Sequence, residues 1–290
     1  MYYYTYALQP DWNHFDHPPM VGWMIRLTTL NLYWLSDLSM RLGSIVSAAV
    51  ATILIFETGT IIKNEKAGFI AALLYNLSIY TCIIAGLFVL PDSPQLLFFT
   101  ASIYLMSKWV VKPNLFKLLD WVLLGCCIGF ATLSKVHGLF LWAGFGAFLI
   151  FNQAKTFKQP ALYLAGLISL MCLIPIVYWN IQNEFITYTF HSKRVAHTSI
   201  HLDTFLQQIV GEFLYQNPLV YIASIIALFN IKQLKKMVQQ DEVISLLLWL
   251  SIPLILTFWV LSLFNPTLPH WTGPGFILSL IHISEPTRRS

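Results

Sequence analysis

The chain has 290 residues, of which 57% are hydrophobic and only 10% are charged, and its formal net charge is +4. Soluble globular proteins carry about 25% charged residues, so this composition cannot cover a water-facing surface. The mean hydropathy of +0.66 indicates a protein whose solvent is the lipid bilayer. The small net charge gives no sign of a nucleic-acid partner.

The apolar runs are long and continuous, without the alternation of membrane-barrel strands, so they predict helices. Because a span needs about 20 apolar residues, we expect an all-α polytopic transmembrane bundle, with a further span beginning near Gly273. The predicted spans are residues 42–62, 67–90, 94–111, 118–134, 137–152, 160–180, 205–229 and 243–264. Residues 18–35 are apolar but interrupted, which predicts an interfacial helix or a re-entrant segment in the first extracytoplasmic loop.

The distribution of lysines predicts the orientation of the bundle. With these spans, four loops on one side of the membrane hold ten of the twelve lysines, and the positive-inside rule makes that side cytoplasmic. The other side receives seven of the eight histidines, although they played no part in the assignment. They are His14, His17, His137, His191, His197, His201 and His270. This clustering predicts a chemical site on the extracytoplasmic face.

The first motif of this face is the segment Phe15–Pro19, which reads Phe-Asp-His-Pro-Pro. Two successive prolines stiffen the backbone and exclude a helix across the step, so they would hold Asp16 and His17 in a fixed loop. The alternative is an ordinary surface loop within an aromatic belt at the membrane interface.

The second motif is Pro91-Asp92-Ser93-Pro94, between two apolar runs. An ionisable residue beside hydrocarbon is a functional candidate, and Asp92 could accept a proton or orient a nucleophile. The alternative is a plain helix start, since Asp and Pro are both favoured there.

The third motif is Ser134-Lys135-Val136-His137. A lysine between apolar runs needs an anionic partner, and a phosphate headgroup would serve. The alternative is a lysine that extends its ammonium group from a helix end to the interface.

Two further segments lie at the outer mouths of predicted spans. Asn180 ends one span before a loop in which Arg194 could clamp a phosphate. His270 and Trp271 precede the last span and could contact a substrate or only anchor the chain at the interface. The HxxxH pair in the loop 181–204, His197 and His201, lacks the third ligand that a zinc site requires. No metal or other cofactor is required by these residues, although a divalent metal stays possible.

In order, these motifs resemble the bacterial branch of the protein O-mannosyltransferase and aminoarabinose transferase superfamily. Its members are GT-C-fold glycosyltransferases, and the resemblance extends from Tyr2 to about Ile277. The shared segments read FDHPPMVGWMIR, PDSP, LSKVHG, YWN and PHWTGP.

The resemblance implies an inverting transfer of a sugar from a polyprenyl-phosphate donor to lipid A, a glycan or a protein. The reaction would take place at the extracytoplasmic face of the bacterial inner membrane. Fixed cations would help the anionic lipid phosphate to leave. The implied catalytic residues are Asp16 and Asp92, the implied donor-phosphate contacts are His17, Lys135 and Arg194, and the possible substrate-site residues are His137, Asn180, His270 and Trp271.

The two ends depart from the family pattern. The family carries an Asp-Glu pair directly before its Tyr-Tyr segment, whereas Met1 stands where that pair would end. We therefore expect residues 1–277 to form a partial transferase domain that lacks its first span and is inactive as it stands. The segment Leu278–Arg288 matches a translated sequencing adapter, so residues 278–290 are predicted to be an artefact.

Two other functions fit part of the pattern. A transporter or flippase of a lipid-linked sugar would also place cations near a phosphate, but it should show repeated halves and broken midplane helices. A non-catalytic partner in an envelope complex would keep its role after loss of Asp16 and Asp92, whereas a transferase would not.

Overall fold

A computed structural model describes residues 2–195, 199–229 and 241–277. Within these ranges every regular element is a helix, which confirms the prediction of an all-α fold. The proposed adapter-derived segment, residues 278–290, and His197 lie outside the described part of the chain.

The centre of the molecule is a bundle built around α5 (Asp92–Val111), which packs between α3 (Asp37–Ile62) and α6 (Leu118–Ser134). On the outer side of α3 lies α4 (Glu65–Leu77), and α6 also packs against α8 (Pro160–Cys172). The central core is aromatic and aliphatic. Its largest fully buried side chains include Tyr75, Tyr80, Phe99, Ile103, Met106, Leu124, Phe145 and Phe148.

Close contact between α6 and α8 follows from small residues. A Cβ atom added at Gly125 would lie 2.5 Å from the Ala165 carbonyl oxygen, and the Ser169 hydroxyl donates to the Gly125 carbonyl at 2.7 Å. Helices in lipid associate by such small-residue packing and hydrogen bonding, because lipid supplies no hydrophobic drive between them.

The described residues contain three helical segments that are long and apolar enough to cross a membrane: α3, the run Pro160–Gln182, and α14 (Glu242–Ser262). The run comprises α8 and α9 (Ile174–Gln182). The apolar helix α6 has 17 residues, which is about 25 Å of helix against a hydrocarbon core of about 30 Å. Several apolar helices are thus present, as expected for a polytopic protein, but fewer than the eight predicted spans qualify by length and composition.

The predicted span 67–90 is wrong as a single helix. Helix α4 ends at Leu77, Ser78 is extended, and a short π-helix, η1 (Tyr80–Ile84), follows. The Thr81 hydroxyl bonds to the Tyr75 carbonyl, so a side chain takes the acceptor that a continued helix would use. The break turns Tyr80 into the interior, where it is fully buried.

The predicted span 205–229 is also interrupted. Helices α11 (Leu202–Tyr215) and α12 (Pro218–Phe229) meet at an angle of 113°. In the described part of the chain, a fourth candidate crossing is counted if this bent pair is taken as one span. Asn217, between them, has φ of +70°. A residue before proline is pushed out of the helical region, and asparagine tolerates the left-handed one, so Asn217-Pro218 explains the bend.

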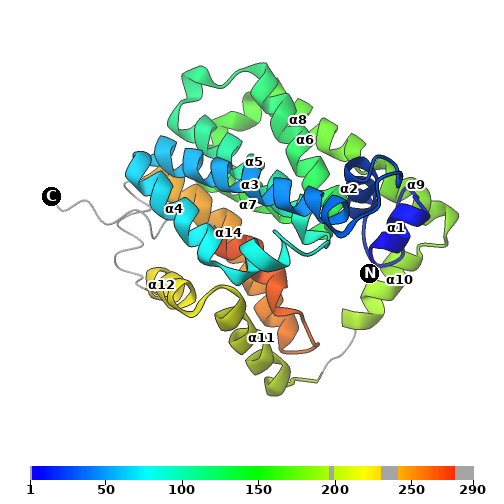
Figure 1. The fold of residues 1–290 in the computed structure, drawn as a ribbon. Helices are drawn as coiled ribbons and strands as arrows, with labels where there is room; N and C mark the ends of the chain where they lie inside the picture. Colours follow the sequence, from blue (N-terminus) through cyan, green and yellow to red (C-terminus); the bar gives the residue numbers. More distant parts are fainter. Residues whose placement is uncertain (1, 196–198, 230–240, 278–290) are drawn as a thin grey trace.

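The first helices stand at one end of the bundle. Helix α1 (Tyr4–Leu8) and α2 (Met20–Thr28) lie near α9 and α10 (Ile186–Val195) in Figure 1. With nine residues, α2 is about 14 Å long and too short to cross a bilayer. This length agrees with the interfacial helix expected within residues 18–35.

Candidate active site

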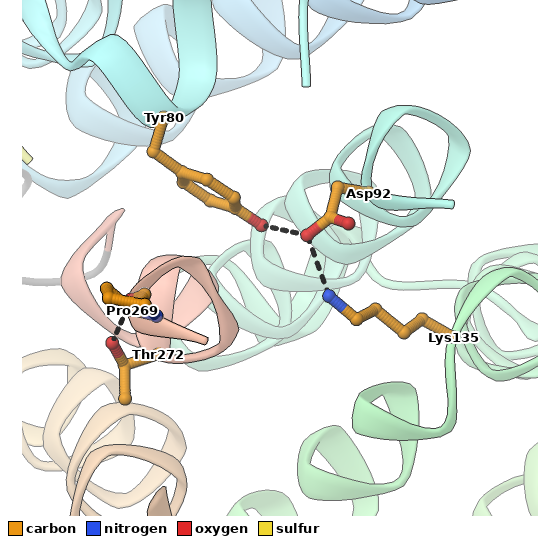
Figure 2. Close-up of polar contacts among 5 residues, drawn as sticks. All are labelled: Tyr80, Asp92, Lys135, Pro269 and Thr272. Carbon is orange, nitrogen blue, oxygen red and sulfur yellow. Dashed lines mark hydrogen bonds and ion pairs between the residues drawn. The ribbon is translucent and has the colours of Figure 1, made fainter. Parts of the chain in front are cut away.

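An ion pair between Asp92 and Lys135 lies at the centre of the candidate site. Lys135 Nζ is 2.8 Å from Asp92 Oδ1, as Figure 2 shows, and the two residues are only 3% and 2% exposed. The Lys135 ammonium group is thus enclosed by the protein, and its anionic partner is a carboxylate of the same chain. Buried ions need both a partner and further hydrogen bonds to offset the loss of water.

The second partner of Asp92 is Tyr80, whose hydroxyl donates to the same Oδ1 at 3.1 Å (Figure 2). The sequence did not point to Tyr80, because this residue falls within the predicted straight span 67–90. The only local signal was Ser78 with Thr81, two hydroxyl residues able to compete for helix carbonyls.

Asp92 and Lys135 meet because each stands at the end of a helix. Asp92 is the first residue of α5, and Lys135 directly follows the last residue of α6. A negative side chain is favoured at a helix N-terminus and a positive one at a C-terminus. Asp92 is thus the first residue of a helix, as one reading of its motif predicts, and it is also the partner of a buried cation.

Several predicted histidines surround the ion pair. The His270 ring stacks on Tyr80 with centroids 6.4 Å apart, and the His137 ring lies 6.0 Å from the Trp271 ring and 4.7 Å from Phe258. Burial, against a partly opposing attraction to Asp92, lowers the pKa of His270 to about 4.

His17 reaches the same site from the first loop. Burial and the Lys135 charge lower the pKa of His17 to about 4. At neutral pH His17 and His270 are therefore uncharged, and Asp92 and Lys135 supply opposite charges beside them.

Asp16 occupies a neighbouring position held by tyrosines. Its carboxylate accepts hydrogen bonds from Tyr2 at 2.8 Å and from Tyr6, and its carbonyl oxygen lies 3.2 Å from His191 Nε2. Burial and the nearby charges of Asp16 and Asp92 raise the pKa of Tyr3. Tyr3 is therefore close to both predicted catalytic carboxylates.

The loop that carries Asp16 and His17 is tied to α9 and α10. Trp179 Nε1 donates to Asp11 at 2.6 Å, Asn13 donates to Thr187 at 3.1 Å, and Phe15 packs edge-on against Phe190. Residues more than 160 positions apart thus fix the first loop, which no local motif could reveal.

Two other residues that the sequence singled out, Asn180 and His201, have hydrogen-bond partners other than the ion pair. Asn180 is buried next to Trp179 and donates to its own helix at Ile176. Arg194 belongs to α10, but its side chain lies outside the described part of the structure. His201 contacts Ser199 at 2.8 Å. Among the residues that the structure describes, no cluster of His, Cys, Asp and Glu could hold a metal ion.

Comparison with known proteins shows the family of this chain. The sequence model of the dolichyl-phosphate-mannose-protein mannosyltransferase family matches residues 16–179, more than half of the chain. The chain belongs to this family. The match begins at Asp16 and includes Asp92 and Lys135, and it confirms the expected GT-C glycosyltransferase superfamily.

Two curated relatives carry more specific names. The chain is 23% identical over 287 residues to the lipid A galacturonosyltransferase RgtD of Rhizobium johnstonii, covering 96% of this chain and 58% of that protein. It is 27% identical over 128 residues to undecaprenyl phosphate-alpha-4-amino-4-deoxy-L-arabinose arabinosyl transferase 2 of Proteus mirabilis, covering 43% and 23%. The chain therefore spans little more than half the length of the Rhizobium johnstonii relative.

A solved structure has the same fold. The ArnT protein of Cupriavidus metallidurans bound to undecaprenyl phosphate is similar with a TM-score of 0.68 and 14% identity. The match covers 97% of this chain and 53% of that one. The chain is thus a multi-pass membrane protein of the GT-C fold, as the apolar helices indicate.

Proposed function

We propose that the protein containing this chain transfers a sugar from a polyprenyl-phosphate donor to an acceptor, with inversion at the anomeric carbon. The acceptor would be lipid A, a glycan or a protein at the extracytoplasmic face of the bacterial inner membrane. The observation that carries the proposal is the buried Lys135–Asp92 pair beside His17, at the end of the bundle where the Asp16 loop is fixed. The names of the relatives, which refer to lipid A and undecaprenyl phosphate, support it.

The proposed step is a single displacement. The acceptor hydroxyl oxygen forms a bond to the anomeric carbon, the bond from that carbon to the phosphate oxygen breaks, and the hydroxyl proton goes to a base. Asp16 is the proposed base. An ionised carboxylate has about four lone-pair positions, so the two tyrosine hydrogen bonds orient Asp16 and leave room for the acceptor hydroxyl.

Lys135 is the proposed electrostatic partner of the leaving phosphate. The lipid phosphate gains one negative charge as the sugar departs, and a preorganised cation is stabilising where charge develops. The ammonium group has three donors, of which Asp92 takes one, so Lys135 could bind phosphate without losing its partner. In this scheme Asp92 acts by holding Lys135, and His17 and Arg194 are further phosphate contacts.

The test is sugar transfer by the natural polypeptide that contains these residues, reconstituted in vesicles with a radiolabelled polyprenyl-phosphate sugar. Asp16→Asn should reduce turnover by about 10²–10⁴-fold, the usual contribution of a general base. Asp11→Asn is the matched control, because the Asp11 carboxylate lies in the same loop but is bound by Trp179 and by the Trp12 backbone N–H. Equal turnover of Asp16→Asn and the wild type would refute the role of Asp16.

One observation favours the transporter alternative. Helices broken within predicted spans, as at Ser78 and at Asn217, are typical of transporters. A flippase would move labelled donor lipid between leaflets with no acceptor present, and Asp16→Asn would leave that movement intact. Lipid movement without any transfer product would replace the transferase proposal.

A further inference from the structure

A second buried carboxylate, Glu212 in α11, lies outside every motif that the sequence analysis identified. Its side chain is fully buried and accepts hydrogen bonds from four side chains, which come from α11, α12, α14 and the turn η5 (Pro269–Thr272). The donors are Gln208 at 2.7 Å, Thr272 at 2.7 Å, Trp259 at 2.9 Å and Tyr221 at 3.3 Å.

These four donors are all neutral. Hydrogen bonds to an ionised acceptor are shorter and stronger than those between neutral groups, so a carboxylate can join several elements more firmly than a neutral side chain. Gln208 is itself fixed, because its Oε1 accepts a hydrogen bond from Thr267 at 2.8 Å. Helix α11 is therefore linked to this region at two points: Glu212 binds Thr272 of η5, and Gln208 binds Thr267 just before it.

Two glycines show how tightly η5 is enclosed. A Cβ atom added at Gly211 would lie 2.2 Å from Pro269 Cγ, and one added at Gly273 would lie 2.1 Å from Tyr80 Cε1. Residues 269–273 therefore lie in direct contact with α11 on one side and with the Tyr80 ring on the other. Figure 2 shows the Pro269–Thr272 turn near Tyr80.

The same turn carries His270, whose ring stacks on Tyr80. Tyr80 in turn donates to Asp92. A continuous series of contacts thus runs from Glu212 through Thr272 and His270 to Tyr80 and the ion pair.

We propose that Glu212 is a positioning residue, which holds the segment 269–273 against Tyr80 and thereby fixes the Tyr80 hydroxyl on Asp92. Its consequence for catalysis rests on the proposed transferase function. Its consequence for the geometry of His270 does not, so the two can fail separately.

The first measurement is an NMR titration of the histidine side chains in labelled natural polypeptide, with His270→Asn used to assign the signal. Glu212→Gln keeps the shape of the side chain but turns one acceptor oxygen into an NH₂ group that faces donors. Release of the turn would expose His270 and move it away from Lys135 and Asp92. Its pKa should then rise from about 4 towards the ordinary 6.5.

The second measurement is turnover. Glu212→Gln should lower kcat by up to about 10²-fold, because a small misplacement caused by a mutation far from the chemistry can cost that much, while KM for the donor changes little. Glu212→Asp, which retains the charge, should restore part of that loss. The matched control is Ser224→Ala, since Ser224 is equally buried but bonds only to Val220 of its own helix.

Each outcome decides the proposal. A risen His270 pKa in Glu212→Gln, with an unchanged one in Ser224→Ala, supports it even if no sugar transfer is detected in the wild type. An unchanged His270 titration in folded Glu212→Gln overturns it. If Glu212→Gln does not fold, Thr272→Val removes a single bond from the cluster, and an unchanged titration in that variant overturns the proposal equally.

Discussion

Two buried carboxyl groups, Asp92 and Glu212, have different kinds of hydrogen-bond and ion-pair partners. Asp92 has a cation, Lys135, and one neutral donor, whereas Glu212 has four neutral donors. A cation with spare donors can bind a second anion, so the Asp92 centre is suited to a phosphate ligand. The donors around Glu212 already bind its two oxygens, and that centre is suited to holding helices together. Burial of a carboxylate alone therefore does not identify a catalytic group.

The largest effect should follow from breaking the ion pair on one side. Lys135→Met leaves Asp92 buried with Tyr80 as its remaining described partner, and removal of one member of a buried pair costs about 3–5 kcal/mol. The free energy of unfolding, measured by denaturation in mild detergent, checks this expectation.

The double variant Asp92→Asn with Lys135→Met sharpens the same prediction. It removes both charges, so it should be markedly more stable than Lys135→Met alone while staying inactive in transfer. A double variant no more stable than the single one would show that Lys135 does not owe its burial to Asp92.

A smaller effect is expected at the contact between the two centres. Gly273→Ala places a methyl group against the Tyr80 ring, and overpacking of this kind costs about 1–3 kcal/mol. Gly146→Ala is the control, because a Cβ atom there meets nothing within 4 Å. Equal thermal midpoints for the two variants would argue against close packing of the 269–273 segment on Tyr80.

Loss of the Tyr80 hydroxyl should be milder still. Tyr80→Phe removes one hydrogen bond to Asp92 but leaves Lys135 in place. A net cost of about 0.5–1.5 kcal/mol is typical for such a bond. A loss as large as that of Lys135→Met, in the same denaturation assay, would make Tyr80 the main partner of Asp92.

A separate effect should be the dependence of stability on pH through His17 and His270. Both have pKa values lowered from 6.5 to about 4 in the folded chain. The unfolded chain therefore takes up their protons first as pH falls, so their contribution is complete above pH 6.5 and is lost between pH 6.5 and 4. Thermal midpoints between pH 7 and 4 should fall less steeply in His17→Asn and His270→Asn; unchanged slopes would contradict the assignment.

The sequence by itself determined the solvent of the protein and its fold class. Composition and long apolar runs determine helices in a bilayer, because lipid offers no partner for the backbone. The motifs at Asp92 and Lys135 were recognised for a related reason: a charge beside apolar runs is costly unless it has a partner.

Only the tertiary structure decided which residues are the partners of these buried charged groups. In the structure the predicted spans 67–90 and 205–229 are each interrupted. Thr81 bonds to a backbone carbonyl at the first break, and Asn217 has a left-handed backbone angle at the second, and a hydropathy pattern records neither. The first break directs Tyr80 to Asp92, and the second places Glu212 beside Thr272, 60 positions along the chain. Hydropathy reports how much a segment avoids water, whereas the pairing of buried polar groups depends on which helices meet, and that is fixed by packing across the whole fold.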